Sequence, residues 1–280
     1  MTLLNQETPL ALGAKQIRAV IFDWAGTTVD FGSLAPVRTL ERVFSEAGVP
    51  ISEEEARRDM GIAKRDHIEA LLSAPRIRDE WLKKYGRPVA SSDLDSLYEC
   101  FIPLQFECLR QYAQVIRGVP EIVIQLRGRG IKIGSTTGYT RAMLDVLVAE
   151  AASAGYQPDC SFSPEDAGAG RPYPFMIYAA AVKLQVYPLG VVVKVGDTAA
   201  DIKEGLNAGV WSVGVAGTGN GIGLAEESFC KLPTPVRAGK LQNARRELEA
   251  AGAHYVVDTL AELTNVIADI EARLSGRIYA

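Results

Sequence analysis

The chain has 280 residues, 48% of them hydrophobic and 23% charged, a composition typical of a globular protein with one large domain or a core plus a smaller insert. Thirty basic residues against 34 acidic ones give a net charge of -4, so no broad positive surface is expected for nucleic acid or an acidic membrane. No apolar run approaches the roughly 20 residues that span a bilayer, and the segment Met1 to Gln16 lacks the basic start of a secretory leader. The four cysteines are scattered along the chain, which fits buried, reduced thiols. We therefore expect a cytoplasmic protein.

The first part of the chain combines one isolated strand with a long helical stretch. Residues 19–22 form a short, fully apolar run that predicts a buried parallel strand. From residue 36 to about 112 the apolar residues recur at helical spacing only. Ser52-x-x-Glu55 and Ser92-x-x-Asp95 are expected helix starts, because each pairs a capping hydroxyl with an acidic residue three positions later.

After Gly118 the pattern changes to helices that alternate with short apolar strands, which is typical of a doubly wound, Rossmann-like parallel sheet. The isolated first strand has no neighbour before residue 131, so we expect it in the same sheet, with a helical cap inserted between the two. The predicted division is a core domain of residues 1–31 and 113–280 and a cap of residues 32–112. The later strands are expected at residues 131–135, 159–162, 191–195, 211–215 and 254–257.

Polar residues follow several of these strands, where ligands bind in open parallel sheets. A single aspartate after a strand is more often a helix cap or a turn residue, but here several polar groups coincide. Two carboxylates brought together would repel unless a cation lay between them, and oxygen ligands suit Mg²⁺. A hydroxyl, a backbone N–H and an arginine could then hold a phosphate. The candidate residues are Asp23, Thr137, Gly138, Arg171, Asp197 and Asp201.

The motifs Asp-x-Ala-Gly-Thr-Thr, Ser-Thr-Thr-Gly, Gly-Arg-Pro and Val-Gly-Asp-Thr-x-x-Asp occur in the order that resembles the haloacid dehalogenase superfamily, over nearly the whole chain. The resemblance implies that Asp23 attacks phosphorus to form an aspartyl phosphate. It implies Mg²⁺ bound by Asp23, Asp197 and the carbonyl of Ala25, with Asp201 in support. Thr137 and Arg171 would hold the phosphoryl group.

Ala25 departs from the usual pattern of this superfamily. Its phosphatases have a second aspartate two positions after the nucleophile, which protonates the leaving alcohol and then activates water. With alanine there, an ester-cleaving enzyme would lack its general acid. Either activity is lost, or the leaving group needs no such proton.

A lysine in the helical insert suggests how a carbon leaving group could depart. An imine between a lysine and an aldehyde is an electron sink, so a neighbouring carbon–phosphorus bond can break to give an enamine. Met60, Lys64 and His67 would share one face of a helix, where burial could lower the lysine pKa to about 7 to 8 and the imidazole could move protons. The alternative is ordinary, because a single lysine on a helix is usually solvated and a methionine is usually in the core.

The motifs Phe-Asp-Trp-Ala-Gly-Thr-Thr, Met-Gly-x-x-Lys-x-Asp-His, Ile-Gly-Ser-Thr-Thr-Gly-Tyr-Thr and Gly-Arg-Pro-Tyr-Pro resemble the phosphonatase family within that superfamily. This resemblance implies phosphonoacetaldehyde as substrate, acetaldehyde and phosphate as products, Lys64 as the Schiff-base residue, and a homodimer. It accounts for Ala25, because an enamine leaves without a proton on oxygen. Tyr139 is expected to contact the substrate, and cap closure to exclude water until the lysine is in place.

Two other functions stay open at this point. A phosphatase or phosphomutase with a general acid from elsewhere would cleave small phosphate esters and tolerate a change of Lys64. A non-catalytic binding protein of the same fold would bind metal or phosphate without turnover. The retained Asp23, Arg171 and Asp197 argue against that second alternative.

Overall fold

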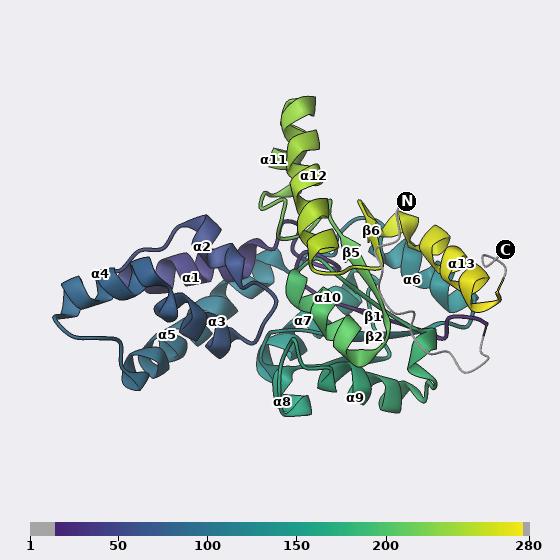
Figure 1. Ribbon diagram of the computed structural model, residues 1–280, viewed down its shortest axis with the longest axis horizontal. Coiled ribbons are helices and arrows are strands. Elements are labelled where there is room, and N and C mark those ends of the chain that lie inside the picture. Colours follow the sequence, from purple (N-terminus) through teal and green to yellow (C-terminus); the bar gives the residue numbers. More distant parts are fainter. Residues whose placement is uncertain (1–14, 277–280) are drawn as a thin grey trace.

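The computed structural model describes residues 15–276; residues 1–14 and 277–280, which the predicted division assigns to the core, lie outside the described residues. Six parallel strands form one sheet in the order β3-β2-β1-β4-β5-β6 (Figure 1). The first strand of the chain thus lies in the middle, which is the hallmark of a doubly wound sheet. The strands are β1 (Ala19–Phe22), β2 (Lys132–Thr136), β3 (Cys160–Phe162), β4 (Val192–Gly196), β5 (Trp211–Val215) and β6 (Tyr255–Val257).

Both faces of the sheet are covered, as the apolar sequences of its strands require. Val20 and Phe22 of β1 point into the core cluster that α6, α7 and α13 complete, whereas Ala19 and Ile21 point toward α9 on the other face. Helix α10 packs against β4 and β5. The helices of the core are α6 (Val119–Gly128), α7 (Arg141–Ser153), α8 (Pro164–Ala167), α9 (Phe175–Leu184), α10 (Ala199–Ala208), α11 (Glu226–Cys230), α12 (Thr234–Ala250) and α13 (Leu263–Leu274), with short 3-10 turns at Leu189–Val191 and Leu260–Glu262.

A group of five helices lies between β1 and α6 and forms the cap, to the left of the sheet in Figure 1. Helix α5 packs along α1 and α3 and reaches back to α7 of the core. The doubly wound parallel sheet with an inserted helical cap is therefore confirmed, while the boundaries at residues 32 and 112 remain our proposal. The cap helices are α1 (Leu34–Glu46), α2 (Glu53–Arg58), α3 (Lys64–Ser73), α4 (Pro75–Tyr85) and α5 (Ser91–Tyr112).

Two expected helix starts have different outcomes. The capping box at Ser52 is confirmed, since Glu55 N donates to the Ser52 hydroxyl and Ser52 N donates to the Glu55 carboxylate. The start at Ser92 is wrong, because α5 begins at Ser91. There Asp93, held by two contacts from Arg87, accepts a hydrogen bond from Ala90 N, so an ion pair fixes which carboxylate caps the helix.

The cysteines and the membrane prediction can be compared with the same structure. All four cysteines are free, but Cys100 and Cys230 are exposed, so the expected burial is wrong for these two. Both lie on polar faces of helices, where the sequence pattern of the helix decides exposure and the residue type does not. Within residues 15–276, every helix is too short or too polar to cross a membrane.

Candidate active site

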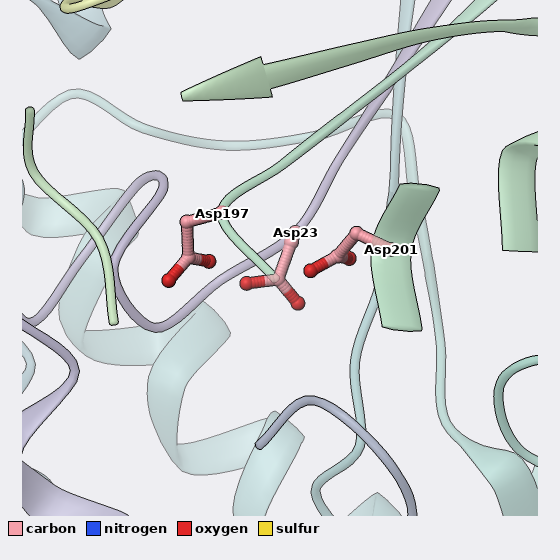
Figure 2. Close-up of side chains that lie close together, drawn as sticks. All are labelled: Asp23, Asp197 and Asp201. Atoms are coloured by element: carbon pink, nitrogen blue, oxygen red, sulfur yellow. The ribbon is translucent and has the colours of Figure 1, made fainter. Parts of the chain in front are cut away.

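Strand register brings the predicted site residues to one edge of the sheet. Phe22 of β1 lies opposite Ser135 of β2 and Val195 of β4, so the residues that follow these strands emerge at the same level. Asp23, Asp197 and Asp201 meet there, with one carboxylate oxygen of each within 4.8 Å of the others. Figure 2 shows the three carboxylates side by side, with Asp23 between the other two. All three are buried.

Asp197 is held from two directions. The Thr27 hydroxyl donates to its Oδ1 at 3.0 Å, and the backbone N–H of Asn220 donates to its Oδ2 at 2.7 Å. Two glycines let the chain approach this closely, because a Cβ added at Gly26 or at Gly219 would overlap the Asp197 side chain. The carboxylate therefore has one fixed orientation before any ligand binds.

A buried ionic network supports Asp23 and Asp201 from below. The Arg171 guanidinium contacts Asp23 at 2.7 Å, Asp201 at 3.0 Å and Glu204 at 2.9 Å. The Lys194 ammonium contacts Asp201 at 3.0 Å, Glu204 at 3.2 Å and a threonine hydroxyl of β2 at 2.8 Å. Two cations thus share three carboxylates, which is the arrangement that buried charges need. The sequence-based prediction included Arg171 and Asp201 but missed Lys194 and Glu204.

The pKa shifts of the three carboxylates differ in direction. Burial, with the charge of Asp201 added, raises the pKa of Asp23 despite Arg171. Burial and the charges of Asp23 and Asp201 raise the pKa of Asp197 well above its usual range. Burial also acts on Asp201, but the charges of Arg171 and Lys194 outweigh it and lower the pKa of that carboxyl. Asp23 shares Arg171 with two other carboxylates and still has a raised pKa, and among the described residues Asp197 has no ion pair, so positive charge is deficient at these two carboxylates.

That deficit is the observation against which a metal ion can be tested. A divalent cation between Asp23 and Asp197 would relieve their repulsion, and carboxylate oxygens are the donors that Mg²⁺ or a similar hard cation prefers. Asp201 already has two cationic partners, which suits the supporting role predicted for it. Ala25, whose carbonyl was predicted to bind metal, lines the same small cavity as Asp23. The residues present fit a divalent metal.

The predicted phosphate-binding residues Thr137, Gly138 and Arg171 line the same small cavity as Asp23. Thr137 is buried, and its hydroxyl accepts from the backbone N–H of Tyr139 at 3.2 Å, which leaves the hydroxyl proton available to a ligand. Gly138 also has a packing role that the sequence did not reveal. A Cβ there would overlap the carbonyl oxygen of Ile62, so glycine is what allows the cap backbone to rest on the core.

The cap supplies the other wall of the site. Lys64, Met60 and His67 are buried at 5%, 5% and 0% exposure. The Lys64 ammonium lies 4.9 Å from the ring centre of Tyr139, in cation–π geometry. The prediction of one shared helical face is wrong for Met60, which precedes α3. The chain turns at Gly61, whose φ is +96°, and the helix starts only at Lys64.

Lys64 and Asp23 line one small cavity of about 20 Å³, and Met60, Tyr139 and Arg171 are among its other lining residues. Burial lowers the pKa of Lys64 to about 8, although the charges of Asp23 and Asp30 oppose the shift. Burial, aided by the Lys64 charge, lowers the pKa of His67 to about 3, so that imidazole is neutral at neutral pH and is a weak base. The structure therefore places the Lys64 amine, with its lowered pKa, in the same cavity as the Asp23 carboxylate, which is the predicted nucleophile toward phosphorus.

Comparison with known proteins agrees with this architecture. The family model of haloacid dehalogenase-like hydrolases matches residues 17–209. The chain is 47% identical over 256 residues to the phosphonoacetaldehyde hydrolase of Bacillus cereus strain G9842, which covers 91% of this chain and 97% of that protein. The protein of the same name from Bacillus cytotoxicus is 48% identical over the same shares of both chains.

A solved structure resembles the whole molecule. The crystal structure of a phosphonoacetaldehyde hydrolase-like protein from Oleispira antarctica superposes with a TM-score of 0.91 at 38% identity, over 96% of this chain and 97% of that one. The chain therefore belongs to the haloacid dehalogenase-like hydrolases and, within them, to the family of the phosphonoacetaldehyde hydrolases.

Proposed function

We propose that this chain hydrolyses the carbon–phosphorus bond of phosphonoacetaldehyde to give acetaldehyde and phosphate. The observation that carries the proposal is that Lys64, whose amine has a pKa of about 8, and Asp23 line the same small cavity. Ala25 stands where an ester-cleaving relative would need its acid. The names and identities of the Bacillus relatives support the same substrate.

Lys64 acts first. Its neutral amine adds to the aldehyde carbon, the resulting carbinolamine loses water to give an imine, and uptake of a proton gives the iminium ion that can draw electrons from the adjacent carbon. Burial favours this step because it lowers the pKa of the amine, so that a larger fraction is unprotonated near neutral pH. His67, three residues further along α3, is buried and neutral, so it adds no positive charge that would disfavour the iminium ion, and Met60 excludes water.

Asp23 acts second. One carboxylate oxygen forms a bond to phosphorus while the carbon–phosphorus bond breaks, and the released electron pair moves through carbon to the iminium nitrogen, which leaves a neutral enamine. Thr137, Gly138 and Arg171 hold the phosphonate oxygens as charge shifts onto them. Water then hydrolyses the aspartyl phosphate to phosphate and the free carboxylate. Protonation of the enamine carbon and hydrolysis of the imine by a second water release acetaldehyde and restore Lys64.

We propose that the divalent metal is Mg²⁺ and that Asp23, the Ala25 carbonyl and Asp197 hold it, with Asp201 in support. When bound, such an ion neutralises phosphonate charge and allows an anionic carboxylate to approach an anionic phosphorus centre. The deficit of positive charge at Asp23 and Asp197, whose pKa values are both raised, supports this assignment. We also propose a homodimer in the cytoplasm, which the family resemblance and the free cysteines favour.

The test is to incubate the protein with phosphonoacetaldehyde and Mg²⁺, with and without borohydride, and to follow acetaldehyde while mapping adducts by mass spectrometry. The expected result is turnover, inactivation by borohydride, and a reduced two-carbon adduct on Lys64. Lys64→Arg keeps a positive charge but forms no imine, so it should lose activity by about a thousandfold or more. Lys203→Arg, at an exposed lysine of α10, is the matched control.

The outcomes separate the alternatives. Turnover without a lysine adduct would keep the substrate and overturn the imine route. Cleavage of phosphate esters in place of phosphonoacetaldehyde, with Lys64→Arg still active, would favour a phosphatase or phosphomutase. Metal or phosphate binding with neither activity would favour a binding protein.

A further inference from the structure

The side chain of Arg57, in cap helix α2, contacts the linker at Gly32 and one core segment at Asn220 and Gly223. It is only 13% exposed. Its guanidinium donates to the carbonyl of Gly32 at 3.0 Å, to Oδ1 of Asn220 at 3.0 Å and to the carbonyl of Gly223 at 3.3 Å. Glu53, one turn earlier on α2, orients it through an ion pair of 2.9 Å. A planar fork is suited to several acceptors at once, which an ammonium is not.

The core end of this contact leads directly to Asp197. Asn220 also donates a hydrogen bond to Arg57, from its Nδ2 to the Arg57 carbonyl at 3.2 Å. The backbone N–H of the same Asn220 donates to Asp197 at 2.7 Å. The neighbouring Gly219 packs so closely on Asp197 that no side chain would fit. One residue therefore joins the cap to the carboxylate.

The cap end of the contact leads to Lys64. The Arg57 carbonyl also accepts from the backbone N–H of Met60 at 3.2 Å, at the start of the turn that ends at Lys64. Met60 and Lys64 both line the small cavity with Asp23. Lys64 follows Arg57 by only seven residues, which comprise the end of α2, the turn at Gly61 and the start of α3.

The third contact is with the linker that joins the two domains. Asp30, Gly32 and Ser33 all have positive φ values, of 54°, 86° and 51°. Such a conformation is costly for the two residues that carry side chains and is kept only where the surroundings hold it. Arg57 binds the carbonyl of Gly32, and Ser33 lines the site cavity. The arginine thus fixes the linker in the form that places the cap over the core.

We propose that Arg57 is a positioning residue that couples the two halves of the reaction centre, by holding Lys64 over the core and Asn220 against Asp197. This inference rests on the proposed function. Arg57 touches no reacting atom, so its loss should change the rate of chemistry more than substrate binding. It should also loosen Asp197, which a residue needed only for folding of the cap would not do.

The test compares Arg57→Gln with Arg58→Gln. Arg58 is the next residue of α2 and is exposed, and in the described part of the chain no hydrogen bond or ion pair joins its side chain to the core. For Arg57→Gln we expect kcat to fall about 10- to 100-fold, the range for losing charge-assisted hydrogen bonds, with KM changed less. Calorimetry of the substrate-free protein should show weaker Mg²⁺ binding. Arg58→Gln should match the wild type in both.

A second variant tests the core end of the same contact. Asn220→Ala should reproduce both effects, and the double variant should be no worse than the more damaging single one, because the two residues act as a pair. If Arg57→Gln fails to fold, Asn220→Ala with Arg57→Lys carries the same test. Arg57→Lys should restore only part of kcat.

The outcomes are separable. A wild-type protein that leaves phosphonoacetaldehyde intact refutes the proposed function. An active wild type with Arg57→Gln and Asn220→Ala both equal to Arg58→Gln in kcat and Mg²⁺ binding refutes the coupling alone. A loss of kcat with Mg²⁺ binding unchanged also overturns it, since it would confine Arg57 to the cap.

Discussion

The two walls of the site solve opposite electrostatic problems. The core wall collects charge: Arg171 and Lys194 each contact carboxylates within about 3 Å and are fully buried with them. The cap wall has fewer charges: Lys64 is as deeply buried, yet it faces an aromatic ring and has no ion pair with any residue between 15 and 276. The carboxylates around Arg171 and Lys194 balance these two buried charges, whereas burial without a paired carboxylate lowers the pKa of the cap amine. The same residue type can thus serve as a fixed charge or a nucleophile according to its neighbours.

The largest expected effect separates the chemistry of the two walls. Asp23→Asn keeps the size of the side chain but removes the nucleophilic carboxylate, so acetaldehyde release should fall by about a thousandfold or more. Imine formation at Lys64 should survive, because it needs only the cap amine. Mass spectrometry after borohydride reduction checks this. Loss of the Lys64 adduct together with turnover would show that the two walls are not independent.

The second prediction uses pH to test the unpaired lysine. Burial lowers the pKa of Lys64 to about 8, and only the neutral amine adds to an aldehyde. Therefore kcat/KM should rise about tenfold per pH unit below 8 and level off above it. Asp30 opposes the shift, so Asp30→Asn should move the profile to lower pH. A profile that is flat from pH 6 to 9 would contradict an amine as the titrating group.

The third prediction breaks the paired wall. Glu204 is fully buried and contacts both Arg171 and Lys194, so Glu204→Gln removes the carboxylate that the two cations share and should lower the free energy of unfolding by about 3 kcal/mol. Chemical denaturation measures this. Glu247→Gln, at an exposed glutamate of α12, should have almost no effect. An equal cost for the two variants would mean that the network contributes little.

Lys194 gives the partner test for the same network. Lys194→Met should also be costly alone, because Asp201 and Glu204 would share one cation in place of two. Combined with Glu204→Gln it should cost less than the sum of the two single changes. Strict additivity would argue against a direct interaction.

The smallest expected effect concerns His67. Its pKa is about 3 in the folded protein against 6.5 for an ordinary histidine, so between these values the unfolded chain binds more protons. The free energy of unfolding should therefore fall as the pH drops from about 6.5, by at most about 1.4 kcal/mol per pH unit. His67→Gln should remove this contribution. The measurement is the difference between the urea denaturation curves of variant and wild type at pH 7 and pH 5.

Sequence patterns predicted the residues that emerge at strand ends. Asp23, Thr137 and Asp197 follow apolar runs, and parallel strands in register bring their ends together whatever the rest of the fold does. Lys64 was found by its motif and by the missing acid at Ala25. These signals are local, so one sequence sufficed for them.

The residues that were missed depend on tertiary contact. Lys194 lies inside a buried strand, and a lysine there requires anionic partners, but the sequence alone did not reveal that Glu204 would supply one. The turn at Gly61 interrupts the expected helix because the cap must rest on the core at that point. Helix start signals failed at Ser92 for a similar reason, since an ion pair with Arg87 selected a different carboxylate.

Gly138 has a consequence for how the molecule could be held in another shape. Because the cap meets the core there through backbone atoms alone, neither side has a flexible side chain that could move aside. One added methyl group, in Gly138→Ala, would act as a wedge that keeps the domains ajar. In crystals of this variant we expect the open form, in which the cap is separated from the core and the substrate can enter. The addition of a single carbon atom would produce it.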